Sequence, residues 1–381
     1  MASVVMISAN FHPYLGGAEK QALGLSRALC DRGVEVTVLT RRLPGLAREE
    51  TVDGVVIRRL PAWGRGLVDS TVFMVSAFLW LLAHPRRFDA VHVHLASSPA
   101  LAASLAGRLL GKRVVVKLGG GKGIGELAVS ETTRAGRLKL RALCLLRPRF
   151  VTVNRELVGE LAEHGLGSAD VVIVPNGVDS NAYHPPAPDA KAELRAELKW
   201  PGGLCFLYVG RLAVEKRLDV FIEQLGLALR EKPADAFAVL VGKGEMEPRI
   251  REAAAAAGLA DRVHFLPPTP EIGRLYRAAD VFVLPSISEG LSNALLVAMA
   301  TGLAVLASRV GGIPDAVADG DSGFLFEPQD IPAFRQALMR FLEDPALAEK
   351  MGRRARADIL AHYNLSAVAQ RYLELYGFQP S

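Results

Sequence analysis

Short apolar, β-branched segments alternate with segments of helical spacing along this 381-residue chain, and this rhythm constrains the fold more than any other feature. Helical spacing is clear at residues 18–29, where Ala22, Leu25 and Leu29 recur on one face. Strands that are apolar throughout are typical of a parallel sheet covered by helices on both faces. The strands predicted in the first half are residues 4–9, 35–40, 55–60, 90–94, 113–118, 151–153 and 171–174.

The rhythm is interrupted once, at residues 175–188 (PNGVDSNAYHPPAP), which are rich in Pro, Asn and Asp and show no periodicity. Such a segment is typical of a linker. At about 100–200 residues per domain, the length fits two domains. We therefore expect an α/β protein with two doubly wound domains. After the linker, the predicted strands are residues 204–210, 236–242, 263–266, 281–285, 303–308 and 324–326, and the predicted helices are residues 216–230, 247–257, 271–278, 290–301 and 331–342.

Composition excludes several classes of protein. Half of the residues are hydrophobic and 22% are charged, which excludes a disordered or fibrous chain. A net charge of +5 is too small for a dedicated nucleic-acid binder, so no nucleic-acid partner is expected. The three cysteines form no CxxC pair, which argues against a disulfide scaffold or zinc site and favours a reducing, cytoplasmic compartment. The longest apolar stretch, residues 71–83, is too short to span a bilayer, and either a buried helix or a membrane-dipping one fits it.

Ligands of open parallel sheets bind at the carboxyl ends of the strands, so chemistry is expected in the loops that follow them. In the first loop, Gly16 and Gly17 precede a helix, whose amino terminus can bind an anion. A plain strand-to-helix turn explains this pair equally well. In VGRLAVEKR, Arg211 and Lys216 follow a strand and could converge on a diphosphate, or form a solvated basic turn with Glu215.

The strongest local feature is the run that follows residues 281–285. Glu289 precedes an apolar helix expected from residue 290, and it could accept hydrogen bonds from sugar hydroxyls or only cap the helix. The amides of the next four residues would then be the first donors of that helix, pointing toward a ligand. These residues are Gly290, Leu291, Ser292 and Asn293.

Three other features of the sequence give weaker evidence for a functional site. His92 and His94 point the same way from one strand, but no third metal ligand is evident, and a polar strand end near a ligand is the better interpretation. Asp319 and Asp321 lie in ADGDSG, which is typical of a surface turn. Residues 134–149 carry six Arg or Lys among leucines. That stretch fits either a contact with an anionic membrane surface or a solvated helix face.

Taken together, the motifs resemble those of the family-4 retaining glycosyltransferases of the GT-B fold. They occur in the order GGAE, PNGVD, VGRLAVEKR, GKGE and PSISEGLSNALLVAMATG, and they cover essentially the whole chain. The resemblance implies two Rossmann-like domains facing across a cleft, with residues 1–180 binding the acceptor and residues 181–360 the nucleotide-sugar donor. Residues 361–381 would form a helix that packs back on the first domain.

The implied activity is metal-independent retaining transfer of a hexosyl group from a nucleotide sugar to an acceptor hydroxyl, without a cofactor. Arg211 and Lys216 would neutralise the donor pyrophosphate, aided by the amides of Gly16 and Gly17. Glu289 would hold the donor sugar, and residues 290–293 would line its phosphate and hydroxyl contacts. Preorganised cations at a leaving diphosphate lower the barrier because negative charge builds there.

Two departures from the family pattern leave alternatives open. Val297 stands where a second Glu usually grips the ribose, eight residues after Glu289, and Gly119 stands where a His is common. Lys117 or Lys122 could compensate for that His. A catalytically degenerate GT-B protein that binds sugar nucleotides, or a nucleotide-sugar epimerase, therefore remains an alternative. If residues 134–149 touch the inner face of the cell membrane, a lipid-linked saccharide in surface-polysaccharide synthesis is a fitting acceptor.

Overall fold

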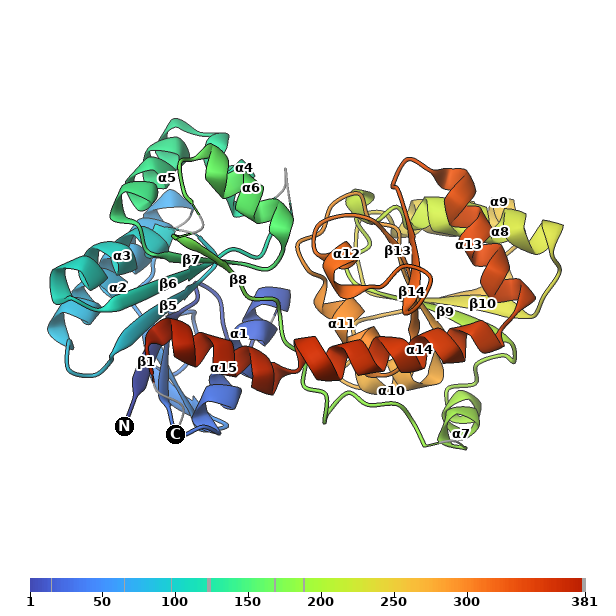
Figure 1. Cartoon of the computed structure of the whole chain (residues 1–381), viewed down its shortest axis with the longest axis horizontal. Helices are drawn as coiled ribbons and strands as arrows, with labels where there is room; N and C mark the ends of the chain where they lie inside the picture. The colour runs from blue at the N-terminus through green and yellow to red at the C-terminus, as the bar shows by residue number, and fades with distance from the viewer. Residues whose placement is uncertain are drawn as a thin grey trace. The chain divides into compact units, whose positions relative to one another are not determined.

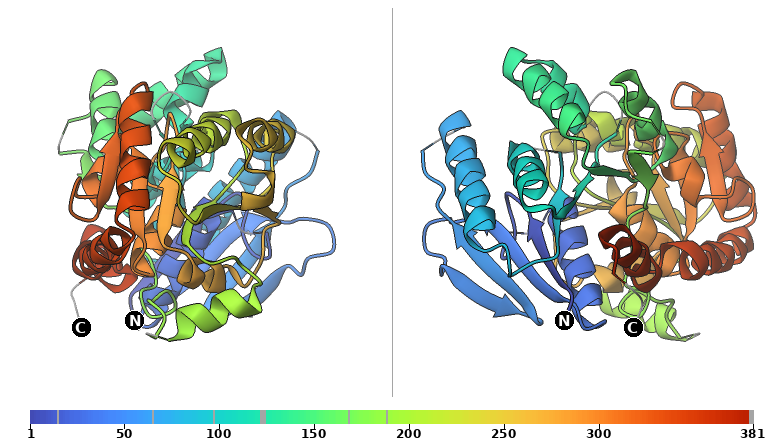
Figure 2. Two further views of the ribbon diagram at one scale, coloured as in Figure 1. Left: turned by 90° about the vertical axis from the view of Figure 1, so that its right-hand side faces the viewer. Right: turned by 60° about the vertical axis from the view of Figure 1, so that its left-hand side comes forward.

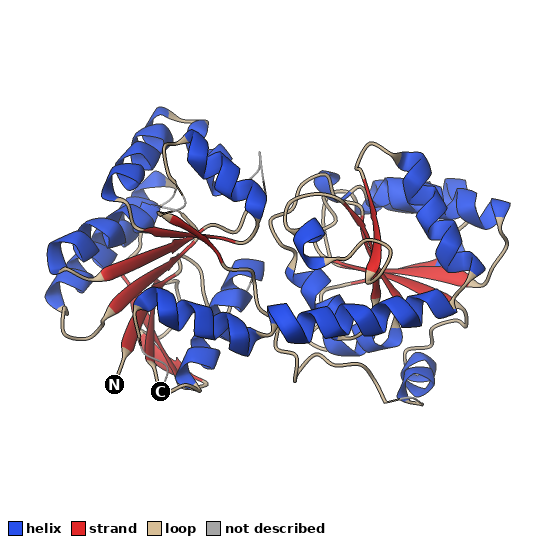
Figure 3. Ribbon diagram, in the orientation of Figure 1, coloured by secondary structure: helices blue, strands red, loops and turns tan. Residues whose placement is uncertain are grey.

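The computed structural model describes residues 1–14, 16–64, 66–96, 98–121, 125–167, 169–187 and 189–378. They form two compact units (Figure 1): unit 1 is Met1–Gly177 with Leu365–Ser381, and unit 2 is Val178–Asn364. Each unit has a central sheet with helices on both faces (Figure 3), so the predicted α/β class with two parallel-sheet domains is confirmed. The chain crosses between the units after Gly177 and after Asn364, three and four residues from the expected boundaries at 180 and 360.

The sheet of unit 1 has eight strands in the order β3-β4-β2-β1-β5-β6-β7-β8. Every described pairing is parallel except that of β3 with β4. All five residues of β1 are buried, as a strand covered on both faces requires. The strands are β1 (Ser3–Ile7), β2 (Glu35–Arg41), β3 (Glu49–Val52), β4 (Val55–Leu60), β5 (Ala90–His94), β6 (Arg113–Lys117), β7 (Arg149–Thr152) and β8 (Val171–Ile173).

Helices from both ends of the chain cover this sheet. The carboxyl-terminal helix α15 packs against α1 and β6, and α3 packs against both α2 and α5 (Figures 1 and 2). The core beneath α1 and α15 joins residues such as Val36, Leu29 and Tyr372. The helices of unit 1 are α1 (Gly17–Cys30), α2 (Leu67–Ala83), α3 (Ser98–Leu110), α4 (Glu126–Glu131), α5 (Arg134–Leu146), α6 (Arg155–Glu163) and α15 (Leu365–Tyr376).

The sheet of unit 2 is parallel in every described pairing, in the order β11-β10-β9-β12-β13-β14. The first strand, β9, lies between β10 and β12, so the strand order reverses between β9 and β12. Ligands of open α/β sheets bind at such a switch point, outside the carboxyl ends of the strands. The strands are β9 (Leu204–Val209), β10 (Ala236–Val241), β11 (Val263–Leu266), β12 (Val281–Leu284), β13 (Ala304–Ser308) and β14 (Gly323–Phe326).

The five helices predicted at residues 216–342 are present, two of them with starts two or three residues later than expected, and the helices Ala190–Glu197 and Ile313–Ala316 were not predicted. Lys216 ends a short 3-10 turn, Val214–Lys216, rather than opening a helix, because Arg217 adopts a left-handed conformation (φ 51°) before α8 starts. The helix expected from residue 290 begins only at Asn293. The helices are α7 (Ala190–Glu197), α8 (Leu218–Glu231), α9 (Glu247–Ala257), α10 (Ile272–Ala278), α11 (Asn293–Ala300), α12 (Ile313–Ala316), α13 (Ile331–Glu343) and α14 (Ala346–Asp358), followed by a π-helical turn, Ile359–Tyr363.

The apolar stretch at residues 71–83 lies within α2 and is buried on one side only. Phe73 and Leu81 are at most 1% exposed, whereas Val75 and Leu79 are 45% and 57% exposed. Of the two expected alternatives, a buried helix is therefore confirmed for one side of α2 only. In the described part of the chain, none of the helices combines the length and apolar character needed to cross a bilayer.

Candidate functional site

Two predicted site residues meet at the switch point of unit 2. Nζ of Lys216, in the loop after β9, lies 2.6 Å from Oε1 of Glu289, in the loop after β12. Only 14% and 12% of these side chains is exposed. The hydroxyl of Ser286 donates to the same carboxylate oxygen over 2.8 Å. A shielded ammonium and carboxylate therefore join the two loops where a ligand of this sheet is expected.

Arg211 has a different partner. Its side chain is 75% exposed, and its guanidinium donates to Oε1 of Glu215 over 2.8 Å. The expected convergence of Arg211 and Lys216 on one position is therefore not seen, since each cation is bound to its own carboxylate. A hydrogen bond fixes the backbone of Arg211: the buried hydroxyl of Tyr208 donates to the carbonyl oxygen of Arg211 over 2.7 Å. Burial raises the pKa of Tyr208, which keeps that hydroxyl protonated.

The segment from Glu289 to Asn293 is a loop followed by one helical residue. Ser292 is the N-cap of α11, and its side chain accepts a hydrogen bond from the amide of Leu295 over 3.3 Å. Gly290 and Leu291 are buried, whereas Ser292 and Asn293 are half-buried. The prediction that residue 290 opens the helix is therefore wrong, because the Ser cap sets the start. Since residues 289–292 are not helical, Glu289 and Val297 do not belong to one continuous helix.

A neighbouring glycine fixes the position of this loop. Gly311, after β13, has φ +55°, and a Cβ atom there would lie 1.9 Å from the carbonyl oxygen of Glu289. The next amide, of Gly312, donates to the carbonyl of Gly290 over 2.6 Å. The backbone that carries Glu289 therefore rests directly on a residue without a side chain. Sequence reasoning missed Ser286, Tyr208 and Gly311, although Ser286 follows its strand in the same way as Arg211.

Gly16 and Gly17 lie in unit 1. Gly16 is the N-cap of α1, with φ −80° and ψ −167°, and no side chain caps the helix. Gly17 is the first helical residue. The loop follows β1, beside which the strand order of unit 1 reverses toward β5. The amino terminus of α1, with its partial positive charge, is thus placed at the switch point of this sheet.

The two histidines of β5 belong to a buried cluster, not to the polar strand end that was expected. The rings of His92 and His94 stack with centroids 4.2 Å apart. Nδ1 of His92 lies 2.5 Å from the hydroxyl of Tyr376 in α15. Burial and the nearby Lys117 lower the pKa of His94 to about 3, so its ring is neutral. In the part of the chain that the structure describes, no three His, Cys, Asp or Glu side chains are grouped to hold a metal ion.

Lys117, one of the two lysines that could compensate for the His missing at Gly119, is bound within unit 1. Lys117 is 6% exposed, and its Nζ donates to Oδ1 of Asn176 over 2.8 Å. Lys122 lies outside the described residues.

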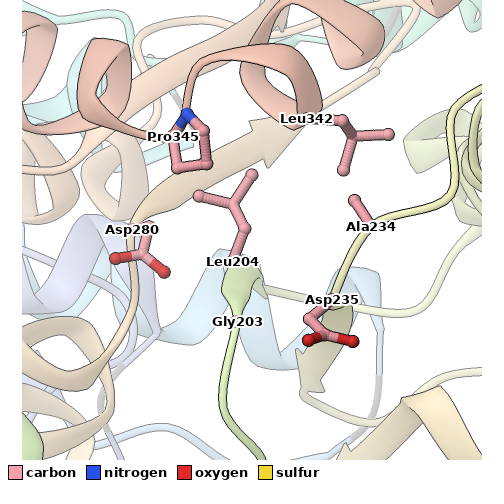
Figure 4. Close-up of a pocket in the computed structure, with 7 residues that line it drawn as sticks. All are labelled: Gly203, Leu204, Ala234, Asp235, Asp280, Leu342 and Pro345. Atoms are coloured by element: carbon pink, nitrogen blue, oxygen red, sulfur yellow. The ribbon is translucent and has the colours of Figure 1, made fainter.

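A cavity of about 300 Å³ in unit 2 is not part of this site (Figure 4). Its residues Gly203, Asp235 and Asp280 come just before β9, β10 and β12, at the opposite edge of the sheet from Lys216 and Glu289. Asp280 binds Lys191 of α7 over 2.5 Å and accepts from the amide of Cys205 over 2.7 Å. The cavity therefore lies where α7 is anchored.

Sequence comparisons agree with this division of the chain. The family model for glycosyl transferases group 1 matches residues 190–358, and the model for Glycosyltransferase Family 4 matches residues 15–182. A 2-deoxystreptamine N-acetyl-D-glucosaminyltransferase of Streptomyces fradiae is 33% identical over 395 residues, which cover 95% of this chain and 90% of the relative. The chain belongs to family 4 of the glycosyltransferases. A D-inositol 3-phosphate glycosyltransferase of Streptomyces scabiei is 31% identical over 90% of this chain and 82% of the relative.

Solved structures show that this glycosyltransferase has the GT-B fold. The Anabaena protein HepE, solved with UDP-glucose, matches 99% of the chain and 100% of its own length, with a TM-score of 0.79 and 18% identity. Sucrose-phosphate synthase from Thermosynechococcus elongatus matches 99% of the chain and 98% of its own, with a TM-score of 0.76 and 23% identity. At these identities the likeness shows the fold alone.

Proposed function

We propose that this glycosyltransferase transfers a hexosyl group from a nucleotide-sugar donor to an acceptor hydroxyl, with retention of the anomeric configuration and without a metal ion. The observation that carries the proposal is the Lys216–Glu289 pair at the switch point of unit 2. A shielded ammonium there is suited to a diphosphate, and the adjacent carboxylate is suited to sugar hydroxyls. HepE, a structure of the same fold, is described in complex with UDP-glucose.

Charge separation in the transfer step explains why these groups are needed. As the bond between the anomeric carbon of the donor sugar and the diphosphate oxygen breaks, negative charge builds on the leaving diphosphate. Lys216 is in place to stabilise that charge, and Arg211 joins it by exchanging Glu215 for the phosphate. Each charge-assisted hydrogen bond contributes about 1.5–3 kcal/mol. The amino terminus of α1, at Gly16 and Gly17, would add amide donors.

Glu289 has two roles in this proposal. Its Oε1 accepts from both Lys216 and Ser286, which fixes the carboxylate. Its Oε2 can accept from a hydroxyl of the donor sugar, because a carboxylate offers two oxygens. The donor would therefore be held by its phosphate and its sugar through one connected set of side chains. Gly290, Leu291, Ser292 and Asn293 would line the same contacts.

The acceptor in this proposal is a lipid-linked saccharide used in surface-polysaccharide synthesis. The support is α5, within the basic stretch at residues 134–149, which carries three Arg and one Lys without any Asp or Glu. Such a helix fits contact with an anionic membrane surface from the cytoplasmic side. The relatives named above differ in their acceptors, so the choice of a lipid-linked acceptor is argued from the basic surface of α5 alone.

Two measurements test the transfer. A thermal-shift screen of UDP, GDP, ADP and TDP identifies the nucleotide, because a bound ligand stabilises the fold by mass action. Turnover of the corresponding donors, with the product anomer read by NMR in the presence of EDTA, then tests retention and metal independence. Inversion at the anomeric carbon, or a requirement for added metal, would contradict the proposal.

One observation favours a second function. Val297 on α11 cannot accept hydrogen bonds from ribose hydroxyls, which is compatible with a degenerate protein that binds nucleotide sugars without turnover. A nucleotide that raises the melting temperature without any donor being consumed would support that alternative. A nucleotide-sugar epimerase would instead change the donor sugar with no acceptor present.

A further inference from the structure

Unit 1 contains a second cavity, of about 570 Å³, beside α5. Its wall includes Arg137, Arg141 and Arg147, and its apolar lining includes Leu140, Leu145 and Leu166. Arg147 directly follows α5 and precedes β7, and Leu166 lies between α6 and β8. This part of the cavity is therefore at the amino edge of the sheet, opposite the edge where the donor and acceptor are expected.

Of the arginines that line this cavity, Arg147 lies 3.9 Å from a carboxylate oxygen of Asp170, whereas the arginines of α5 have no such partner in the described part of the chain. Among the described residues, no carboxylate lies within ion-pair distance of Arg134, Arg137 or Arg141. The one carboxylate that lines the cavity, Glu131, lies 3.1 Å from Nε2 of His164. By contrast, Arg251 of α9 and Arg353 of α14 are each paired with a Glu of their own helix. The concave surface beside α5 therefore has an excess of positive charge that is complementary to an anion.

Exposed leucines accompany these arginines. Leu138 and Leu145 are 69% and 80% exposed, and they alternate with Arg134 and Arg141 on one helical face at positions i, i+4, i+7 and i+11. Arginine can rest its stem on apolar surface while its guanidinium reaches a phosphate. Leu140 and Leu166 line the cavity and are only 4% and 3% exposed. The ligand that fits is therefore anionic at one end and apolar at the other.

The same character extends to the two neighbouring helices. Helix α3 packs between α2 and α5 (Figure 1). Val75 and Leu79 of α2 and Leu109 of α3 are 45%, 57% and 63% exposed. Helix α3 has no Asp or Glu, and the single acid of α2, Asp69, binds Arg41 over 2.6 Å. The neighbouring helices therefore add exposed apolar side chains and few acidic ones to the surroundings of the cavity, a composition that fits contact with a bilayer.

We infer that the cavity beside α5 binds the phosphate of an anionic membrane phospholipid, while the exposed faces of α2, α3 and α5 lie on the bilayer. The inference rests on the membrane contact in the proposed function and gives it a binding site and a lipid class. The phosphate contacts Arg137 and Arg141, and Leu138 and Leu145 enter the apolar region below the headgroups. The cavity is separate from the donor site, so membrane binding does not require a nucleotide sugar.

Vesicle flotation of the full-length protein tests the inference. We expect flotation with vesicles of phosphatidylcholine and phosphatidylglycerol, and little with phosphatidylcholine alone. R137E/R141E should weaken binding by at least about 30-fold, since each cation near the surface contributes about 1 kcal/mol. The control R42E/R371E makes the same change in net charge at two other exposed arginines of unit 1 and should bind like wild type. L138S/L145S, at exposed positions, should also weaken binding without unfolding the protein.

Several outcomes would overturn the inference. One is binding of the wild-type protein to vesicles without anionic lipid as strongly as to vesicles with it. Another is the absence of binding to any vesicle. A third is an equal loss of vesicle binding in R137E/R141E and in the control R42E/R371E. Stabilisation by glycerol phosphate that depends on Arg137, without vesicle binding, would identify a site for a soluble phosphate instead. Donor consumption is measured in parallel on the same variants. Turnover without vesicle binding would reject the lipid site alone, and vesicle binding without turnover would reject the proposed transferase alone.

Discussion

Nζ of Lys216 lies 2.6 Å from Oε1 of Glu289, and this contact joins the loops that follow β9 and β12. Because both side chains are largely shielded, each charge is stabilised mainly by the other, and the charge of Glu289 also by the hydroxyl of Ser286. Removing one partner of such a pair leaves an uncompensated charge, which is more harmful than removing both. The pair therefore contributes to folding as well as to the proposed chemistry, and the two contributions can be separated.

For Lys216→Met, we expect donor turnover to fall by about 10²–10³-fold or more, because a preorganised cation at the leaving group is lost. The free energy of unfolding should also fall, since Glu289 keeps its charge without the ammonium. The double variant K216M/E289Q should recover most of that stability but no turnover. Urea unfolding and donor consumption measure the two effects, and full turnover in Lys216→Met would reject the proposed role of Lys216.

Arg211→Ala should reduce donor turnover with little effect on the stability of the fold, unlike Lys216→Met. The side chain is 75% exposed and its i,i+4 pair with Glu215 is worth only about 0.3–0.5 kcal/mol, so the melting temperature should hardly change. Turnover should fall by about 10²-fold if the guanidinium moves to the donor phosphate. Arg353→Ala is the matched control, because Arg353 is 68% exposed and forms a similar pair with Glu349. Equal activity in the two variants would count against Arg211.

Much of the fold could be predicted because its strands are buried on both faces. Apolar or alternating runs located thirteen of the fourteen strands in the described residues to within about two residues, and the polar edge strand β3 (EETV) was missed because it is not apolar. Helix starts were less predictable. At α11, a Ser cap three residues after Glu289 sets the boundary, and the glycine before it misled the prediction.

The site was predictable in its residues but not in its pairing. Strand-end position identified Lys216 and Glu289, because parallel strands bring such loops together. Arg211 was expected to converge with Lys216, but its guanidinium pairs with Glu215, four residues along the chain. Gly311 could not be found from spacing, since only the fold brings its backbone against Glu289.

Gly311→Ala should disrupt the loop that carries Glu289. A Cβ atom at this position would lie 1.9 Å from the carbonyl of Glu289, and φ is +55°, so both contact and conformation are unfavourable. We expect a loss of stability well above 1 kcal/mol together with loss of turnover. Gly320→Ala is the control. Gly320 has φ +81°, so the substitution strains the backbone, but no atom lies within 4 Å of the added Cβ. Its stability should fall by about 1 kcal/mol and its turnover should persist. Similar behaviour of the two variants would show that Gly311 does not support the site.

The buried histidines make a prediction about pH. The pKa of His94 is lowered to about 3 by burial and by Lys117, and that of His92 is lowered as well. Below about pH 6.5 the unfolded chain takes up a proton at His94 that the folded protein does not, so stability falls as the pH falls. Between pH 7.0 and 5.5 this one residue should remove about 1.3 kcal/mol from the free energy of unfolding.

His94→Gln removes that proton uptake, so its loss of stability between pH 7.0 and 5.5 should be smaller than that of wild type by the same amount. Urea unfolding at the two pH values measures the difference, whatever the absolute stability of the variant. Lys117, His92 and the Tyr376 hydroxyl remain in the cluster, so their contributions cancel in the comparison to first order. His184→Gln, at an exposed ring, should keep the wild-type pH dependence. An unchanged pH dependence in His94→Gln would mean that the folded protein protonates His94, and that the cluster admits charge.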